Sequence, residues 1–427
     1  MMGPGVVGLQ QTTSYKVVVP FYIYAAISLL VGTVLLLFHT DLFHQHHFTP
    51  YTLAITHTMA LGWGTMIIFG ASHQLLPVLI SGKLHSNLLA YLTFLFTGIG
   101  IPLLVYGFYV FNTGWILKSA AVLINWGVIF YLINVLLSIY HSDKNEVYAW
   151  FVAAASIWLF STTFYGLLLV FNFTSSLLPG ESVTYLSIHA HLGLIGWFLT
   201  LVIGVGSRLI PMFLISKYAN ERNLWWIFGL VNGSLISFLV FKILQVSPEF
   251  YYLPLILGLM GILLFGNHCR LAYKVRIRKN VDDQMKISLL SVLQMIIPVA
   301  VMVVVMAILP STKNQNLILL YGFCIFFGWI TALIFGMTFK TLPFIIWNKV
   351  YQKKAHKGKT PAPKELFNDK VYKAMSITYI SGFIFMLFGI IFQIDFILKT
   401  AAVLLLMAAV FYVYNSAIII LHKPKKQ

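Results

Sequence analysis

The sequence contains twelve apolar stretches long enough to cross a lipid bilayer as α-helices, for which about 20 residues are needed. Hydrophobic residues make up 59% of the 427 residues and charged residues only 9%, so a soluble domain could not cover this much apolar surface. A membrane β-barrel would require short strands of alternating polarity, whereas these stretches are long and unbroken. The sequence therefore predicts a single all-α transmembrane domain over residues 1–427. The expected helices span residues 17–38, 50–80, 87–111, 115–140, 148–172, 184–215, 224–246, 250–273, 287–309, 316–347, 371–392 and 395–421.

Lysine and arginine gather in alternate connections between these helices. The basic side includes Lys16, Lys83, the segment 270–286 and the long loop at 348–370, and the connections on the other side carry almost none. By the positive-inside rule, both termini and the basic loop are cytoplasmic. This distribution explains the net charge of +17 by contact with anionic lipid headgroups and argues against nucleic-acid binding. We expect a multi-pass protein of a bacterial inner membrane.

The sequence also contains an internal repeat. Five residues of the second expected helix recur in the sixth helix, all at one constant shift in numbering. Four of the five recur again in the tenth helix, also at one constant shift, and there Phe323 replaces the histidine. The matched residues are His57, Gly62, Trp63, Gly70 and Pro77; His191, Gly196, Trp197, Gly204 and Pro211; and Phe323, Gly328, Trp329, Gly336 and Pro343.

A second match joins the fourth helix to the twelfth. The stretch around Lys118 recurs around Lys399, and Asn134 matches Asn415 at the same shift in numbering. Together the matches predict three four-helix arcs with pseudo-threefold symmetry, whereas most twelve-helix transporters divide into two halves of six. The expected repeat units are about residues 17–140, 148–273 and 287–421.

Three histidines lie inside the expected membrane helices, near the ends opposite the basic side. An ionisable side chain within a bilayer is costly, so each is a functional-site hypothesis by default. His189 and His191 project about 200° apart on a helix and cannot bind the same metal ion. His57 and His191 occupy equivalent repeat positions at similar depth, which favours axial coordination of one iron by both. The alternative for each is a buried ring that bonds a neighbouring carbonyl.

The motif His-x-His-x-Gly-x-x-Gly-Trp at residues 189–197, followed by Pro211 in a chain of three four-helix arcs, resembles subunit I of the heme–copper oxidase superfamily. The likeness is greatest to the C-type oxidases and to shorter membrane heme proteins implicated in the nitric oxide response. The resemblance implies that His57 and His191 bind a low-spin heme. It implies that His189 binds the iron of a second heme where one is present, with one or two b-type hemes in all.

The sequence differs from that family in two ways. The family places His-x-His on the tenth helix, and here it lies on the sixth. The seventh helix, 224–246, contains no histidine, so the copper-binding pair is absent, and neither bound copper nor oxygen reduction is expected. The resemblance then implies electron transfer, or binding of nitric oxide or a similar gas, with a quinone or a cytochrome as electron donor. Lys118 and Lys399 would neutralise heme propionates; the alternative is that they extend to the membrane surface.

Two other functions stay open from the sequence, as does the question of whether the protein is an oxidoreductase. A heme-free transporter or assembly factor would bind copper or a substrate through the same histidines. A nitric oxide or oxygen reductase subunit would be completed by a partner. All eleven acidic residues lie in loops or at helix ends, which argues against proton pumping. Cys269 and Cys324 are too few for a disulfide framework or a thiolate cluster.

Two further groups of polar residues are candidate binding sites. Four histidines follow the first helix, and they form either a copper or zinc site or a solvated loop. Three residues near the basic-side ends of the second, sixth and tenth helices either bind an anion or a quinone headgroup or extend to the interface. The first group is His39, His44, His46 and His47, and the second is His73, Arg208 and Lys340.

Overall fold

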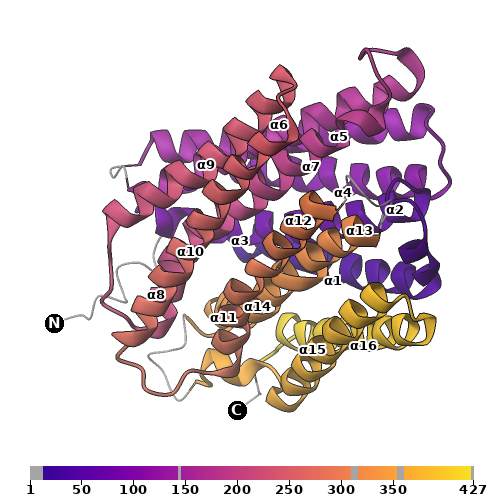
Figure 1. Ribbon diagram of the computed structural model, residues 1–427. Coiled ribbons are helices and arrows are strands. Elements are labelled where there is room, and N and C mark those ends of the chain that lie inside the picture. Colours follow the sequence, from indigo (N-terminus) through magenta and orange to yellow (C-terminus); the bar gives the residue numbers. More distant parts are fainter. Residues whose placement is uncertain (1–12, 143–145, 309–315, 353–359, 425–427) are drawn as a thin grey trace. The chain divides into compact units, whose positions relative to one another are not determined.

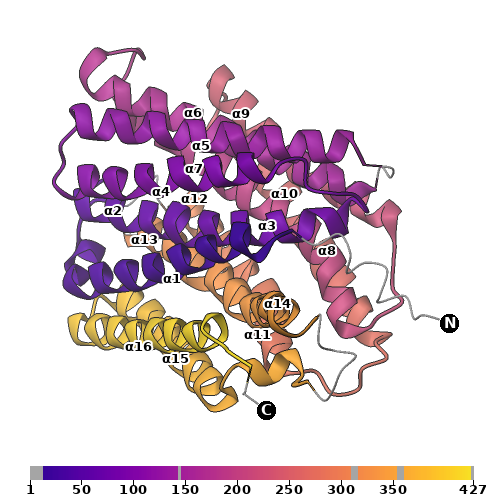
Figure 2. The ribbon, with the colours of Figure 1, turned by 180° about the vertical axis from the view of Figure 1, so that it is seen from behind.

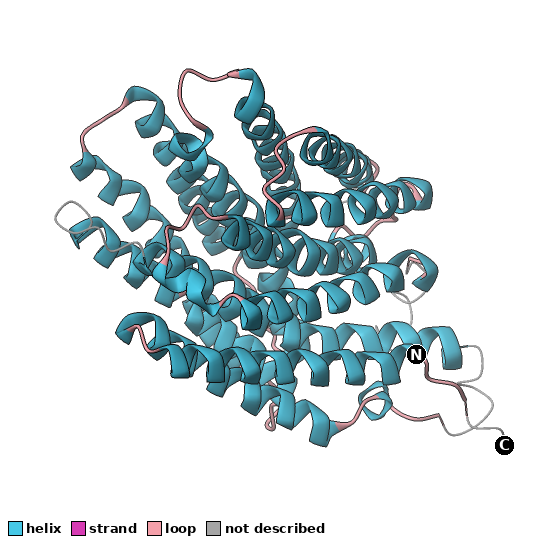
Figure 3. Cartoon of the chain, turned by 90° about the vertical axis from the view of Figure 1, so that its right-hand side faces the viewer, coloured by secondary structure: helices cyan, strands magenta, loops and turns pink. Residues whose placement is uncertain are grey.

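The computed structural model describes residues 13–142, 146–308, 316–352 and 360–424, and this part of the chain contains helices and no strand (Figure 3). Within it, twelve spans are long and apolar enough to cross a membrane, which confirms the all-α class and the expected number (Figure 1). Each observed end lies within four residues of its predicted position. Residues 353–359 of the basic loop lie outside the described residues.

Eight of the twelve spans are built around one α-helix each, one contains two α-helices in succession, and three contain a π turn between two α-helices. The π turns are named η3, η5 and η7. The elements are α1 (Tyr15–Phe38); α2 (Pro50–His57), η3 (Thr58–Thr65) and α3 (Met66–Leu79); α4 (Asn87–Tyr109); α5 (Trp115–Tyr140); α6 (Val147–Ser175); α7 (Leu186–His191), η5 (Leu192–Leu199) and α8 (Thr200–Leu214); α9 (Glu221–Leu244); α10 (Tyr252–Lys274); α11 (Asp283–Gln294) with α12 (Ile296–Ile308), which share one span; α13 (Asn316–Phe323), η7 (Cys324–Ile330) and α14 (Thr331–Tyr351); α15 (Asp369–Phe392); and α16 (Asp395–Ile420).

The chain divides into two compact units. The first unit comprises Met1–Val17 and Ser72–Val281, and the second comprises Val18–Ala71 and Asp282–Gln427. Two of the three boundaries between them fall inside α1 and α3, and the third falls directly before α11. The finer division into three arcs stays a prediction.

Close helix packing holds the first unit together. There α5 packs between α4 and α6, α6 packs against η5 and α8, and α9 pairs with α10. Glycine permits the nearest approaches, because a Cβ at Gly127 would lie 2.5 Å from Thr97 Cγ2, and a Cβ at Gly100 would lie 2.8 Å from Ile124 Cγ1. Small residues at such crossings are typical of membrane helices, whose association depends on packing rather than on the hydrophobic effect.

The second unit uses the same kind of packing. Helices α15 and α16 lie side by side in both ribbon views (Figures 1 and 2). Helix α11 crosses α14 so closely that a Cβ at Gly336 would overlap the Ser288 hydroxyl. The interior of this unit is aromatic: the ring of Trp63 packs edge to face on Phe335 and Tyr412, with centroids 6.0 and 5.1 Å away.

One span of the second unit is divided between two α-helices, which hydropathy did not predict. Helix α11 ends at Gln294 and α12 begins at Ile296. Pro298 has no amide hydrogen for the carbonyl of Gln294, four residues earlier, and its ring clashes with that carbonyl. Hydropathy averages over a whole span, so it locates the span and misses the break.

Candidate functional site

A π turn begins directly after the repeat-matched residue in each of three spans. The turns η3, η5 and η7 follow His57, His191 and Phe323, so their first residues keep the spacing of the sequence repeat. π turns are rare in proteins, and those that occur often lie at functional sites. The repeat therefore has a structural counterpart at the residues that carry the candidate site.

A threonine hydroxyl stabilises each π turn. In all three, the hydroxyl donates to the carbonyl five residues earlier, at 2.6–2.9 Å. Such a bond satisfies a backbone acceptor inside a membrane span, where an unpaired carbonyl is costly. The donors and acceptors are Thr65 and Ala60, Thr200 and Ile195, and Thr331 and Phe326.

His57 and His191 are held in the same way. The Nδ1 atom of His57 lies 2.8 Å from the carbonyl oxygen of Leu53, and that of His191 lies 2.7 Å from the carbonyl oxygen of Ser187, four residues earlier in each case. A carbonyl can only accept, so Nδ1 carries the hydrogen and Nε2 carries the lone pair. Both rings are half-buried. His57 belongs to the second unit and His191 to the first, and their pairing stays a prediction.

The surroundings of the two histidines differ. The His191 ring lies on the ring of Phe238 of α9, with centroids 4.5 Å apart and planes inclined by 34°. Near His57, α1 passes close to the start of η3, where a Cβ at Gly32 would lie 2.8 Å from Met59 Sδ. The His191 ring thus packs against an aromatic side chain, whereas His57 lies near the close approach of α1 to η3.

His189 points toward α6. Its Nδ1 lies 3.1 Å from the carbonyl oxygen of Thr162, which makes it the third ring in the Nδ1–H tautomer. Its Cε1 packs against Gly166, where a Cβ would lie only 2.8 Å away. Gly166 therefore provides the space that this ring occupies. The sequence identified His189 as a candidate and gave no indication of Gly166.

Aromatic packing fills the equivalent position in the third span. The Phe323 ring stacks on Phe327 and Phe383 at centroid distances of 5.2 and 5.6 Å. Unlike the other two turns, η7 contains a non-helical residue, Gly328, with φ −87° and ψ −113°. The hydroxyl of Tyr379 donates to the Gly328 carbonyl at 2.8 Å and so satisfies the acceptor that the kink exposes.

The two lysines predicted to face propionates have different environments. Lys118 Nζ lies 5.2 Å from the ring centroid of Phe171 of α6, which is within range of a cation–π interaction. Lys399 is exposed near the start of α16. Their role toward heme propionates stays a prediction.

Arg208 and Lys340 pair with the carboxylates of residues that stand at the N-cap position of other helices. Arg208 lies 3.9 Å from Glu146, the N-cap residue of α6, and Lys340 forms an ion pair with Asp282, the N-cap residue of α11. An acid just before a helix is also favourable for the helix dipole. Sequence reasoning missed both partners, although acids in front of expected helices are an N-cap signal. The ring of His73 packs edge to face on the ring of Tyr131, with the two centroids 5.6 Å apart.

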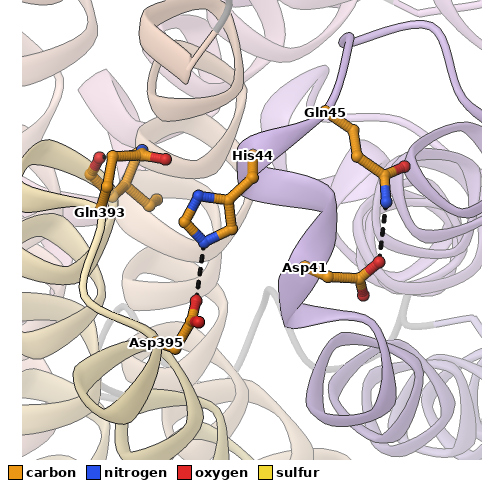
Figure 4. A network of polar contacts seen from close by, with 6 residues as sticks. Asp41, His44, Gln45, Gln393 and Asp395 are labelled. Carbon is orange, nitrogen blue, oxygen red and sulfur yellow. Dashed lines mark hydrogen bonds and ion pairs between the residues drawn. The ribbon is translucent and has the colours of Figure 1, made fainter.

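The four histidines after α1 do not gather around one point. His44 Nε2 lies 2.7 Å from Asp395 Oδ1, while Gln45 donates to Asp41 at 2.8 Å (Figure 4). His39 stacks on Tyr51, and His46 stacks on His47. Among the described residues, no three or more His, Cys, Asp or Glu side chains are arranged to hold a metal ion.

The residues Asn134 and Asn415, matched in the sequence, perform one structural task. Each amide side chain bonds both the N–H and the carbonyl of the residue that caps the preceding helix, at 2.8–3.0 Å. The capping residues are Ser86 before α4 and Asn368 before α15. The match between the two asparagines is thus explained by helix-start geometry rather than by a ligand.

Comparison with known proteins adds no relative: no protein-family model matches the chain, and no curated protein matches it. Its function must therefore be inferred from its own residues. The most distinctive of these are His57 and His191, which directly precede η3 and η5.

Proposed function

We propose that this multi-pass membrane protein binds heme through His57 and His191, and that it transfers electrons or binds nitric oxide or a similar gas without reducing oxygen. The observation that carries the proposal is the shared local geometry of the two histidines. Each stands directly before a π turn, and each donates its Nδ1–H to the carbonyl four residues earlier. The third π turn follows Phe323, so a histidine is not needed to form such a turn.

The donor set suits a heme iron. Neutral imidazoles coordinate through the nitrogen that carries the lone pair, which in both rings is Nε2. A carbonyl that accepts from the other nitrogen fixes the tautomer and raises the basicity of the ligand, as in many metal sites. Heme would supply one-electron redox chemistry and gas binding. The protein would orient the rings, and Lys118 and Lys399 would neutralise propionates.

His189 would serve as the ligand of a second heme. Its Nδ1–H is fixed by the Thr162 carbonyl, so its Nε2 also carries the lone pair. Phe323 stands at the matched position of the third span and offers no donor. Helix α9 contains no histidine, so the histidine pair that binds copper in the resembled family is absent from it, and oxygen reduction is not proposed.

The proposal includes an orientation. The three arcs would stand in the bacterial inner membrane with both termini and the basic connections in the cytoplasm. His57 and His191 would then lie toward the outer face. A quinone or a cytochrome would supply the electrons.

The test is a visible spectrum of the purified protein together with its heme stoichiometry. Wild type is expected to show a Soret band with split low-spin bands, and His57→Ala and His191→Ala are each expected to lose the low-spin heme. The matched control is His141→Ala, because His141 Nδ1 also lies 2.7 Å from the carbonyl four residues earlier but at an exposed helix end without a π turn. A colourless wild-type protein would refute the proposal.

A heme-free transporter or assembly factor is the second candidate. It is favoured by the two interrupted spans of the second unit, at Met295 and at Gly328. Discontinuous helices are common at substrate sites of transporters, since irregular backbone at membrane depth lines a cavity or is buried in protein. A colourless preparation that binds copper, with binding lost in His57→Ala, would support this candidate over the first.

A further inference from the structure

An unusual surface lies where two membrane helices of the first unit end on the basic side. Helix α8 ends at Leu214 and α10 at Lys274, and an antiparallel bridge between Ser216 and Arg276 joins the segments that follow. The amide of Ile277 donates to the Ile215 carbonyl at 3.1 Å. We call residues 215–217 and 273–279 the bridged surface. It directly follows the ends of two apolar spans, which is where a membrane helix leaves the hydrocarbon.

Apolar side chains project from this surface. Ile215 is 54% exposed, Val275 52% and Ile277 60%. Ile215 also adopts the left-handed conformation, with φ 52° and ψ 49°. A β-branched residue is strained there, and glycine or asparagine would fit the backbone better. The backbone alone therefore does not account for an isoleucine at this position.

Three lysines lie on the same two segments as these apolar side chains. Lys217, Lys274 and Lys279 are exposed on the bridged surface. Arg276 is used internally: it donates to the carbonyls of Tyr273 and Lys279 and lies 3.9 Å from the Tyr273 ring centroid. Arg276 thus shapes the turn, and the lysines supply the outward charge.

The charge balance of the neighbourhood is strongly positive. Residues 215–222 and 270–279 include seven basic residues and one acid, Glu221. Four to eight basic residues directly beside a membrane helix are the usual signature for anionic lipid. The seven are Lys217, Arg222, Arg270, Lys274, Arg276, Arg278 and Lys279.

We infer that the bridged surface is a binding site for anionic phospholipid: the lysines bind the phosphate headgroup, and Ile215, Val275 and Ile277 contact the glycerol and upper acyl chain. A soluble acidic partner would match the charge and leave the apolar side chains in water. A bilayer satisfies both, because apolar tips enter the interface while lysine heads stay with the phosphates. The site is independent of the proposed heme, so either proposal can fail alone.

The test is competition between phosphatidylglycerol and phosphatidylcholine for the detergent-solubilised full chain, read by native mass spectrometry. Wild type is expected to prefer phosphatidylglycerol. Each lysine near a membrane surface contributes about fivefold in affinity, so the triple variant Lys217→Gln, Lys274→Gln, Lys279→Gln is expected to weaken that binding by about 100-fold. The matched control changes three exposed lysines of the second unit, Lys364, Lys370 and Lys373, to Gln and keeps the preference.

Two further arms separate charge from apolar contact. Raising the salt concentration is expected to weaken binding to wild type, because the headgroup contact is electrostatic. Ile215→Asn with Ile277→Asn is expected to lower the residual binding at high salt without lowering the thermal midpoint, since asparagine tolerates the left-handed conformation. The inference is overturned if wild type shows no preference, if the first triple variant retains it, or if the control triple loses as much.

Discussion

Adding a single methyl group at Gly166 tests how His189 is placed. In Gly166→Ala the new Cβ would lie 2.8 Å from His189 Cε1 and 3.3 Å from its Nδ1, whereas nonbonded carbon atoms prefer about 3.5–4.0 Å. The ring must therefore move by roughly 1 Å. The bond from Nδ1 to the Thr162 carbonyl, now 3.1 Å, would then be too long to contribute.

The energetic terms can be compared. Overpacking costs about 1–3 kcal/mol, and the lost hydrogen bond about 1 kcal/mol. Replacing glycine by alanine inside a helix stabilises the helix by about 1 kcal/mol. We expect a net loss of about 2 kcal/mol in the free energy of unfolding, which corresponds to a thermal midpoint about 4–8 °C lower for a unit of this size.

The measurement is thermal unfolding of the detergent-solubilised protein by intrinsic fluorescence. Gly229→Ala in α9 is the matched control, because a Cβ there would meet no atom within 4 Å. The control is expected to unfold at the wild-type temperature or slightly above it. Equal midpoints for the two variants would refute the close contact between α6 and His189.

Two other predictions concern the ends of the helices. Lys340→Met should destabilise the protein by about 3–5 kcal/mol, because it leaves Asp282 unpaired in a contact whose side chains are only 11% and 25% exposed. Arg208→Met should cost less than about 1 kcal/mol, since its pair is 3.9 Å long and the arginine is 41% exposed. Equal losses in denaturation midpoints for the Lys340 and Arg208 variants would contradict this ranking. Asn134→Ala and Asn415→Ala should each cost about 2–3 kcal/mol, because two backbone groups at a helix start lose their partner. Unchanged unfolding for either asparagine variant would show that water replaces the amide.

The sequence alone determined the number and position of the membrane spans. A span needs a fixed length of apolar residues whatever its neighbours are, so composition within a window is sufficient. The sequence also determined which residues correspond between spans, since His57, His191 and Phe323 keep their spacing to the glycines and the proline that follow. The sequence also indicated these histidines as candidates, because an ionisable side chain inside a bilayer is costly and usually has a function.

Only the tertiary structure decided how those side chains are held. The kink at Gly328, whose carbonyl accepts from Tyr379, and the space that Gly166 leaves for His189 depend on contacts between residues far apart in the chain. The carboxylate partner of Lys340 lies 58 residues away, and no local pattern specifies that distance. Hydropathy is a sum over neighbours in sequence, whereas ring orientation and ion pairing depend on neighbours in space, which the sequence does not directly list.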